Sequence, residues 1–186
     1  MKNTEKVRLI SRCDDFGSCH AANLAIGKCH KEGILTCTSI MVCCPWFEEA
    51  ADIARRNPDL QVGVHTTLTA EWHLYRWGPV LPVPQVPSLV NDRGYFHPRT
   101  QEFLDGNPRP AEVEAELRAQ IDRALAYDLD IAYIDYQPNE TTYRLIDNNN
   151  ETGEHHYYVQ AIAFGEATPT TFNATKFTVV PTISTT

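Results

Sequence analysis

The 186-residue sequence lacks several features that would assign it to particular classes of protein. No apolar run is long enough to cross a bilayer, which argues against a membrane partner. The N-terminus is charged and no apolar signal segment follows it, so we expect a cytoplasmic protein. Lysine and arginine number 16 against 24 acidic residues, and no basic stripe is visible. This charge balance argues against a nucleic-acid or anionic-membrane partner.

Cysteine is present, but not in a metal-binding spacing. Six cysteines fall within the first 44 residues and none of them form a C-x-x-C pair, which argues against a structural zinc ribbon. We interpret them as reduced thiols that act as small core residues, with disulfides as the alternative.

Strand-like and helix-like segments alternate along most of the chain. Strand patterns cover residues 7–13, 35–44, 60–68 and 129–136, and helix patterns cover 20–33, 46–56 and 110–127. A stretch from about 69 to 109, rich in proline and aromatics, is too long for a passive connection and is therefore expected to be functional. This order predicts an α/β fold with a mainly parallel sheet and right-handed crossovers.

An adjacent pair of carboxylates, Asp14 and Asp15, follows the first strand-like run and precedes Phe16 and Gly17. The carboxyl ends of parallel strands carry the chemistry of many α/β folds. Neighbouring carboxylates repel each other unless a cation or a shared proton separates their roles, so one metal ligand beside one base would resolve the repulsion. The alternative is ordinary turn chemistry, in which the second Asp caps the following helix.

His65 lies near the C-terminal end of the third strand-like run. Neighbouring parallel strands end at the same edge of a sheet, so we expect Asp14, Asp15 and His65 to share one face. An Asp and a His with an open coordination position suit a divalent metal that activates water. The alternative is a core histidine that is hydrogen-bonded to the backbone.

Five blocks of sequence, in their order and spacing, resemble the YdjC-like carbohydrate deacetylase family. They are Cys13-Asp14-Asp15-Phe16-Gly17, His20-Ala21-Ala22-Asn23, Thr38-Ser39-Ile40-Met41-Val42, Pro45-Trp46-Phe47-Glu48-Glu49-Ala50 and Val62-Gly63-Val64-His65-Thr66-Thr67-Leu68-Thr69. Further stretches, including Ala70-Glu71-Trp72 and Arg76-Trp77-Gly78-Pro79, resemble one bacterial subgroup. The resemblance covers roughly residues 6–137.

The resemblance implies the front part of a distorted (β/α) barrel that removes acetyl groups from an N-acetylated sugar or oligosaccharide. It implies that Asp14 is the base for the attacking water, and that Asp15 and His65 bind a divalent metal ion, Mg or Zn. Amide hydrolysis needs a nucleophilic water, a polarised carbonyl and a base, which a metal beside a carboxylate supplies.

One position departs from the family pattern. The fourth strand of the family ends with another His that completes the metal site, whereas this chain reads Ile134-Asp135-Tyr136-Gln137. An amide oxygen is a weaker ligand than imidazole for zinc-like metals. We therefore expect Gln137 to leave the site impaired.

Residues 138–186 differ in character from the rest of the chain. They are rich in Thr and Asn, and runs at 141–146, 157–163 and 177–180 predict a short antiparallel β tail. We predict two domains: a partial barrel at 6–137 and a β-rich tail of foreign character at 138–186, arising from a fusion, a frameshift or a chimera.

Two classes of function stay open. The first is a metal-dependent carbohydrate deacetylase or an impaired relative of one. The second is a non-catalytic barrel fragment that binds carbohydrate or a partner, in which Trp72 and Trp77 of the long loop stack on sugar rings or simply pack locally. Because an incomplete barrel leaves strand edges and apolar faces unpaired, we also expect copies of the chain to associate, as a homo-oligomer or by aggregation.

Overall fold

The computed structural model describes residues 10–136, 141–149 and 155–163, and the chain divides into two compact units, Met1–Gln137 and Pro138–Thr186. The first unit alternates strands and helices. Its elements are β1 (Arg12–Phe16), α1 (His20–Glu32), β2 (Cys37–Ile40), α2 (Phe47–Arg55), β3 (Gln61–Thr66), the 3-10 turns η1 (Val83–Gln85) and η2 (Pro87–Leu89), α3 (Thr100–Asp105), α4 (Pro110–Ala126) and β4 (Ile131–Tyr136).

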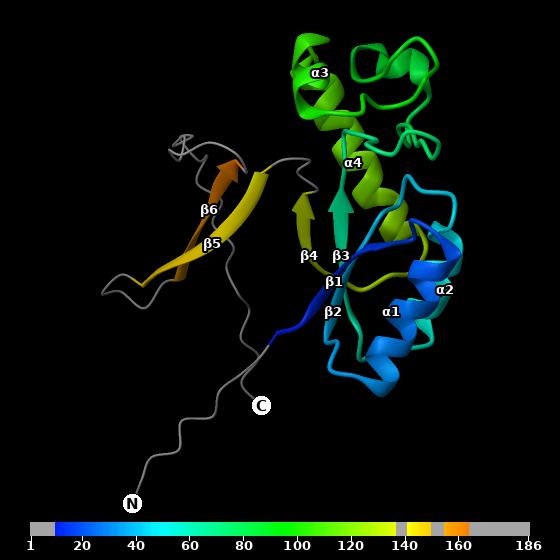
Figure 1. Ribbon diagram of the computed structural model, residues 1–186, viewed down its shortest axis with the longest axis vertical. Helices are drawn as coiled ribbons and strands as arrows, with labels where there is room; N and C mark the ends of the chain where they lie inside the picture. The colour runs from blue at the N-terminus through cyan, green and yellow to red at the C-terminus, as the bar shows by residue number, and fades with distance from the viewer. Residues whose placement is uncertain (1–9, 137–140, 150–154, 164–186) are drawn as a thin grey trace, which may run out of the picture. The chain divides into compact units, whose positions relative to one another are not determined.

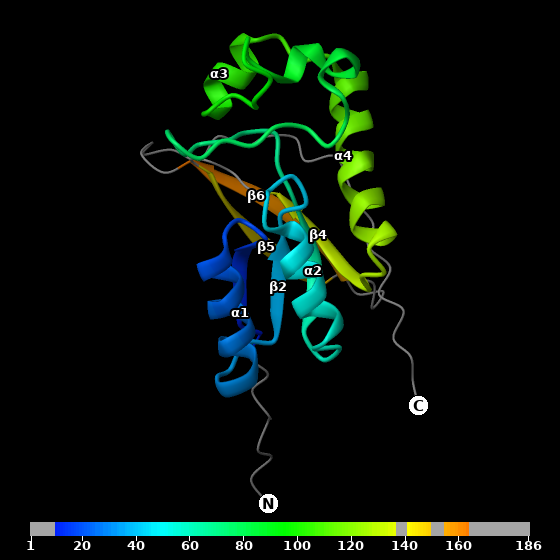
Figure 2. The same ribbon diagram turned by 90° about the vertical axis from the view of Figure 1, so that its right-hand side faces the viewer.

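The four strands form one parallel sheet in the order β1-β2-β3-β4 (Figure 1). Strand order follows sequence order, as in a (β/α) barrel. Helices α1, α2 and α4 lie on the same side of the sheet (Figure 2). The predicted α/β fold with mainly parallel strands is therefore confirmed.

The two faces of the sheet have different chemistry. On the helix side, Ile40 of β2 and Val62 and Val64 of β3 belong to a buried cluster that includes Phe47 of α2 and Ala124 of α4. Successive strand residues point to opposite faces, so the residue that follows Val64, His65, lies on the other face. Side chains at the ends of β1, β2, β3 and β4 meet on that face and form the candidate site described below.

A β-bulge at the end of β1 alters this alternation. The β1–β2 register shifts between Cys13 and Phe16, and Asp15 has a φ of 64°, in the left-handed region that non-glycine residues rarely adopt. Phe16 is fully buried in the core on the helix side of the sheet. In a regular strand, Asp15 rather than Phe16 would point to that side. The bulge thus brings Asp14 and Asp15 to the same side of the sheet.

Helix α4 buries a polar stripe against the loops that follow β3. Gln120 accepts a hydrogen bond from the Thr67 backbone N–H at 3.0 Å and donates one to the Thr67 carbonyl at 2.8 Å. Glu116, fully buried, accepts the backbone N–H groups of Val80 and Leu81. These contacts fasten the segment that follows His65 to the helix.

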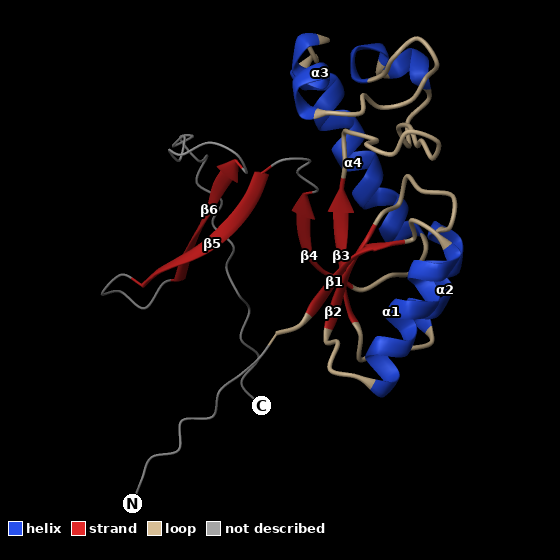
Figure 3. Ribbon diagram, viewed as in Figure 1, coloured by secondary structure: helices blue, strands red, loops and turns tan. Residues whose placement is uncertain are grey.

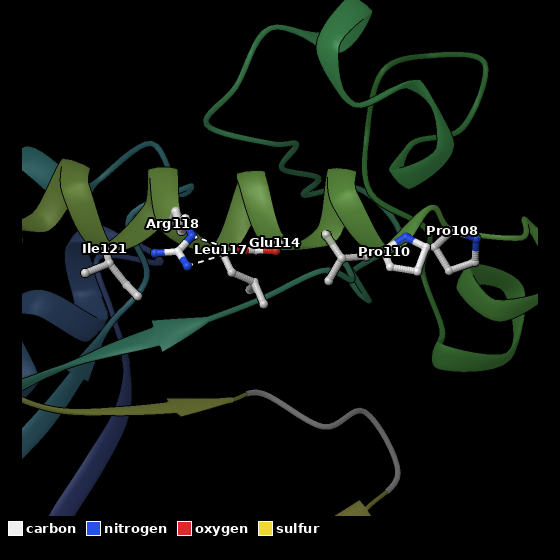
Figure 4. A pocket seen from close by; sticks show the side chains of 7 residues that line it. Pro108, Pro110, Glu114, Leu117, Arg118 and Ile121 are labelled. Carbon is white, nitrogen blue, oxygen red and sulfur yellow. Dashed lines mark hydrogen bonds and ion pairs between the residues drawn. The ribbon is translucent and has the colours of Figure 1, made fainter. Parts of the chain in front are cut away.

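Three larger apolar residues of α4 lie on a different face of the same helix. Val113, Leu117 and Ile121, together with Pro108 and Pro110, line an open groove of about 600 Å³ (Figure 4). This groove contains none of the residues of the candidate site.

The second unit contains β5 (Thr141–Asn149) and β6 (His155–Ala163), which pair antiparallel with Thr141 opposite Ala163 (Figure 3). The predicted strand at 177–180 lies outside the described residues. The foreign character of this unit stays a prediction.

Element bounds differ from expectation chiefly around the site. The Asp14–Asp15 pair was expected after the first strand, but it lies inside β1, because the bulge continues the strand to Phe16. The second strand is shorter than residues 35–44, since the chain turns into a loop after Ile40. The long loop predicted at 69–109 contains η1, η2 and α3.

Candidate metal centre

His65 lies at the centre of the site and is only 3% exposed. Its ring Nδ1 lies 2.8 Å from Asp135 Oδ1, and its Nε2 lies 3.7 Å from Asp15 Oδ1. A carboxylate only accepts hydrogen bonds, so the Nδ1–H donates to Asp135 and the lone pair of a neutral ring sits on Nε2. This is the arrangement in which an outer carboxylate orients a histidine that binds metal.

Asp135 receives donors on both carboxylate oxygens. Oδ1 accepts from His65, and Oδ2 accepts from the Ser39 hydroxyl at 2.7 Å and pairs with the Arg12 guanidinium at 2.8 Å. Burial alone would raise the pKa of Asp135, but His65, Ser39 and Arg12 outweigh burial and hold it below its ordinary value. Asp135 is therefore ionised and fixed in place.

The pKa of His65 is shifted by the same contacts. Burial lowers it, yet the hydrogen bond and charge of Asp135, with Asp14 and Asp15 nearby, outweigh burial and raise it above the ordinary value. These contacts favour positive charge at His65, which a proton or a metal ion would supply.

Asp14 is held by Arg12. The guanidinium contacts both oxygens of Asp14, with Nε at 2.8 Å from Oδ1 and Nη2 at 3.2 Å from Oδ2. Ligand atoms of Asp14, His65 and Asp135 lie within 4.8 Å of one another, so these residues form a second candidate ligand set. Asp15 Oδ1 and His65 Nε2, 3.7 Å apart, offer the other pair of donor atoms.

The loop after β1 is fixed by one buried amide. The Asn23 side chain, fully buried, accepts the Gly17 backbone N–H at 2.7 Å and donates to the Trp46 carbonyl at 3.0 Å and to Glu49 Oε2 at 2.8 Å. Asn23 therefore ties the Asp15–Phe16–Gly17 turn to α2.

A cavity of about 230 Å³ lies beside Asp15. Its lining comprises Asp15, Ser18, Cys19, Met41, Glu71, Trp72, Tyr75 and Trp77. Trp77 is 3% exposed, and its indole Nε1 has no hydrogen-bond partner among the described residues. Trp72 is 59% exposed. Burial, reinforced by the charge of Asp15, raises the pKa of the Glu71 carboxyl.

The structure brings Asp14, Asp15 and His65 together, and it places Trp72 and Trp77 at the cavity beside Asp15. The roles given to these residues stay predictions. Gln137, expected at the third ligand position, lies outside the described residues. Sequence reasoning missed Arg12, Ser39 and Asp135; only Asp135, an acidic residue at the end of a strand, gave a signal that could have been used.

Comparison with known proteins gives consistent matches over the first unit. Residues 8–138 match the model of the family described as YdjC-like protein. The chain is 39% identical over 130 residues to a protein of Brevibacillus brevis named carbohydrate deacetylase, covering 69% of this chain and 48% of that protein. A Geobacillus stearothermophilus protein of the same name is 36% identical over 126 residues, covering 68% and 47%.

A solved structure agrees with these matches. An Enterococcus faecalis protein, proposed to cleave cellobiose phosphate, is 36% identical with a TM-score of 0.62, over 69% of this chain and 47% of that one. The chain spans about half the length of the curated relatives it matches. The family match covers more than half of the chain and coincides with the unit that holds Asp14, Asp15 and His65, so this chain belongs to the YdjC-like protein family.

Proposed function

We propose that this chain binds a divalent metal ion, Mg or Zn, between Asp15 and His65, for hydrolytic deacetylation of an N-acetylated carbohydrate. The observation that carries the proposal is the geometry of His65. Asp135 holds Nδ1, so that Nε2 faces Asp15 Oδ1 across 3.7 Å. Relatives named carbohydrate deacetylase support the reaction class and a carbohydrate substrate.

The donor atoms fit such an ion. Zinc is bound at roughly 2.0–2.2 Å by imidazole nitrogen and carboxylate oxygen, which puts two such donors about 3.4 Å apart in a tetrahedral site. The observed 3.7 Å between Asp15 Oδ1 and His65 Nε2 is close to that value. A bound divalent ion would polarise the acetyl carbonyl and lower the pKa of its water.

The protein would supply the remaining parts of the reaction. Asp14, adjacent to the site, would take a proton from the attacking water as general base. Trp72 and Trp77 would contact the sugar in the cavity beside Asp15, and the buried Trp77 Nε1–H is suited to donate to a ligand oxygen there. Dry walls and fixed orientation raise the effective molarity of such groups.

We also propose that the site is impaired in this chain. Gln137 replaces the imidazole that the family resemblance implies, and an amide oxygen is a weaker ligand for zinc-like metals. Weak metal binding and slow acetate release are the expected consequences.

A second function is favoured by the contacts of Asp14. Both of its oxygens contact the Arg12 guanidinium, and if neither is open to an attacking water, the chain would act as a non-catalytic carbohydrate-binding or interaction protein. Binding of an N-acetylglucosamine oligomer without acetate release would favour this alternative.

Three substitutions test the roles. Asp15→Ala and His65→Ala should abolish metal retention, measured by metal analysis of the purified protein. Asp14→Asn should retain the metal and remove any acetate release from N-acetylglucosamine oligomers. Glu114→Gln, an exposed change on α4, is the matched control and should behave as wild type. Metal loss in Asp14→Asn with retention in Asp15→Ala would reverse the assignment.

A further inference from the structure

Arg12 places a guanidinium among the carboxylates of the site. It lies on β1 two residues before Asp14, so the two side chains share one face of the strand. Its Nε and Nη2 contact both oxygens of Asp14, and its Nη1 contacts Asp135 Oδ2 on β4 at 2.8 Å. One side chain thus bridges the first and last strands of the sheet.

The resulting charge arrangement is uneven. Asp14 and Asp135 both pair with Arg12, and Asp135 also accepts from His65 and Ser39. Asp15 Oδ1 lies 3.7 Å from His65 Nε2. Arg12 thus pairs with Asp14 and Asp135, and the histidine faces Asp15.

We propose that Arg12 is a positioning residue that acts as a resident cation between Asp14 and Asp135. It closes the Asp14–His65–Asp135 set to divalent metals and restricts a metal to the Asp15–His65 side. This inference rests on the proposed function, because it concerns which residues of that site face the metal.

The physical reason is competition between cations for the same oxygens. A guanidinium is always charged and its planar fork matches a carboxylate, so it resists displacement. A second cation at those oxygens would also be repelled by the guanidinium. Removing the guanidinium should therefore open the acidic set to metal.

The experiment is calorimetric titration of Mn²⁺ into the whole chain and four variants. Arg12→Gln should bind Mn²⁺ roughly tenfold tighter than wild type or take up a second ion. Arg12→Lys, which keeps the charge, should stay near wild type. Arg118→Gln, on the exposed face of α4 and paired with Glu114 alone among the described residues, loses the same charge away from the site and should change nothing. If Arg12→Gln does not fold, Arg12→Met also removes the positive charge and keeps the packing of the aliphatic part of the side chain.

The double variant Arg12→Gln/Asp14→Asn separates this proposal from the proposed function. The gain in affinity should disappear in the double variant, because the opened oxygens belong to Asp14. Two results would overturn the proposal. In the first, neutral Arg12 variants fold, as judged by circular dichroism, and bind Mn²⁺ as the wild type does. In the second, the gain in affinity persists in the double variant, which lacks the Asp14 carboxylate. Failure of the proposed function would give a different result: the Asp15→Ala variant would bind Mn²⁺ as tightly as the wild-type chain does.

Discussion

His65 is held by one hydrogen bond whose partner lies on the neighbouring strand. His65 and Asp135 are paired in the β3–β4 register, so the sheet itself places the imidazole beside the carboxylate. A single carboxylate therefore fixes both the orientation of the ring and which nitrogen faces Asp15.

Asp135→Asn should lower the pKa of His65, measured by NMR titration of the metal-free protein, because the amide removes the charge that outweighs burial. In the wild type the folded pKa of His65 is raised above its unfolded value. Its contribution to stability is therefore fully present below about pH 6.5 and is lost as the pH rises through the folded value. Glu114→Gln is the control. An unchanged His65 pKa in Asp135→Asn would show that Asp135 does not govern the ring.

At the scale of secondary-structure elements, two buried amides connect the site to the helices. Asn23 of α1 holds the turn after β1, and Gln120 of α4 holds the residue two positions beyond His65. Both side chains form hydrogen bonds with backbone groups. The candidate ligands are therefore positioned by hydrogen bonds to the main chain near them as well as by contacts with one another.

Asn23→Ala should lower the free energy of unfolding by about 2 to 4 kcal/mol, because the Gly17 N–H would be buried without a partner and two further hydrogen bonds would be lost. Urea unfolding measures this change. Gln101→Ala, at an exposed residue of α3 whose side chain donates to Asp105, should cost little. Equal stability losses in the two variants would contradict the role given to Asn23.

Gln120→Glu should destabilise the protein by about 3 kcal/mol or more, because a buried carboxylate would face the Thr67 carbonyl and the Glu116 carboxylate. The same chemical change at exposed Gln101 serves as the control in thermal unfolding. If Gln120→Glu melts at the wild-type temperature, the α4 network does not fasten the segment after β3.

Periodicity and turn residues were sufficient to predict the alternation of strands and helices, because the helix-side core uses simple apolar spacing. Placement of Asp14, Asp15 and His65 on one face also followed from parallel topology. The β-bulge at Asp15 was not predictable, since it depends on Phe16 being drawn into the core and leaves no local pattern. Arg12 was missed because its partner on β4 lies more than a hundred residues away.

At the scale of the whole molecule, the described parallel sheet has four strands, with β1 and β4 as its outermost members. The curated relatives are about twice as long as the matched segment. An association between copies of the chain, which would cover such strand edges, stays a prediction.

Gln137→His should tighten binding of Zn²⁺ by roughly tenfold or more, since imidazole replaces a weak amide ligand. Acetate release should rise only as far as metal occupancy does, because the added ligand acts on metal binding. Calorimetry and an acetate assay on N-acetylglucosamine oligomers measure the two outcomes. Ordinary turnover by the unmodified chain, about 1–10³ per second, would mean that the site is complete and not impaired.

The most direct test of the account is the position of a bound metal. Anomalous diffraction from crystals soaked in Zn²⁺ should place a peak about 2.0–2.2 Å from both Asp15 Oδ1 and His65 Nε2, with Arg12 still paired to Asp14. A peak between Asp14 and Asp135 with Arg12 displaced, or no peak near His65, would contradict the assignment of Asp15 and His65 as the metal ligands.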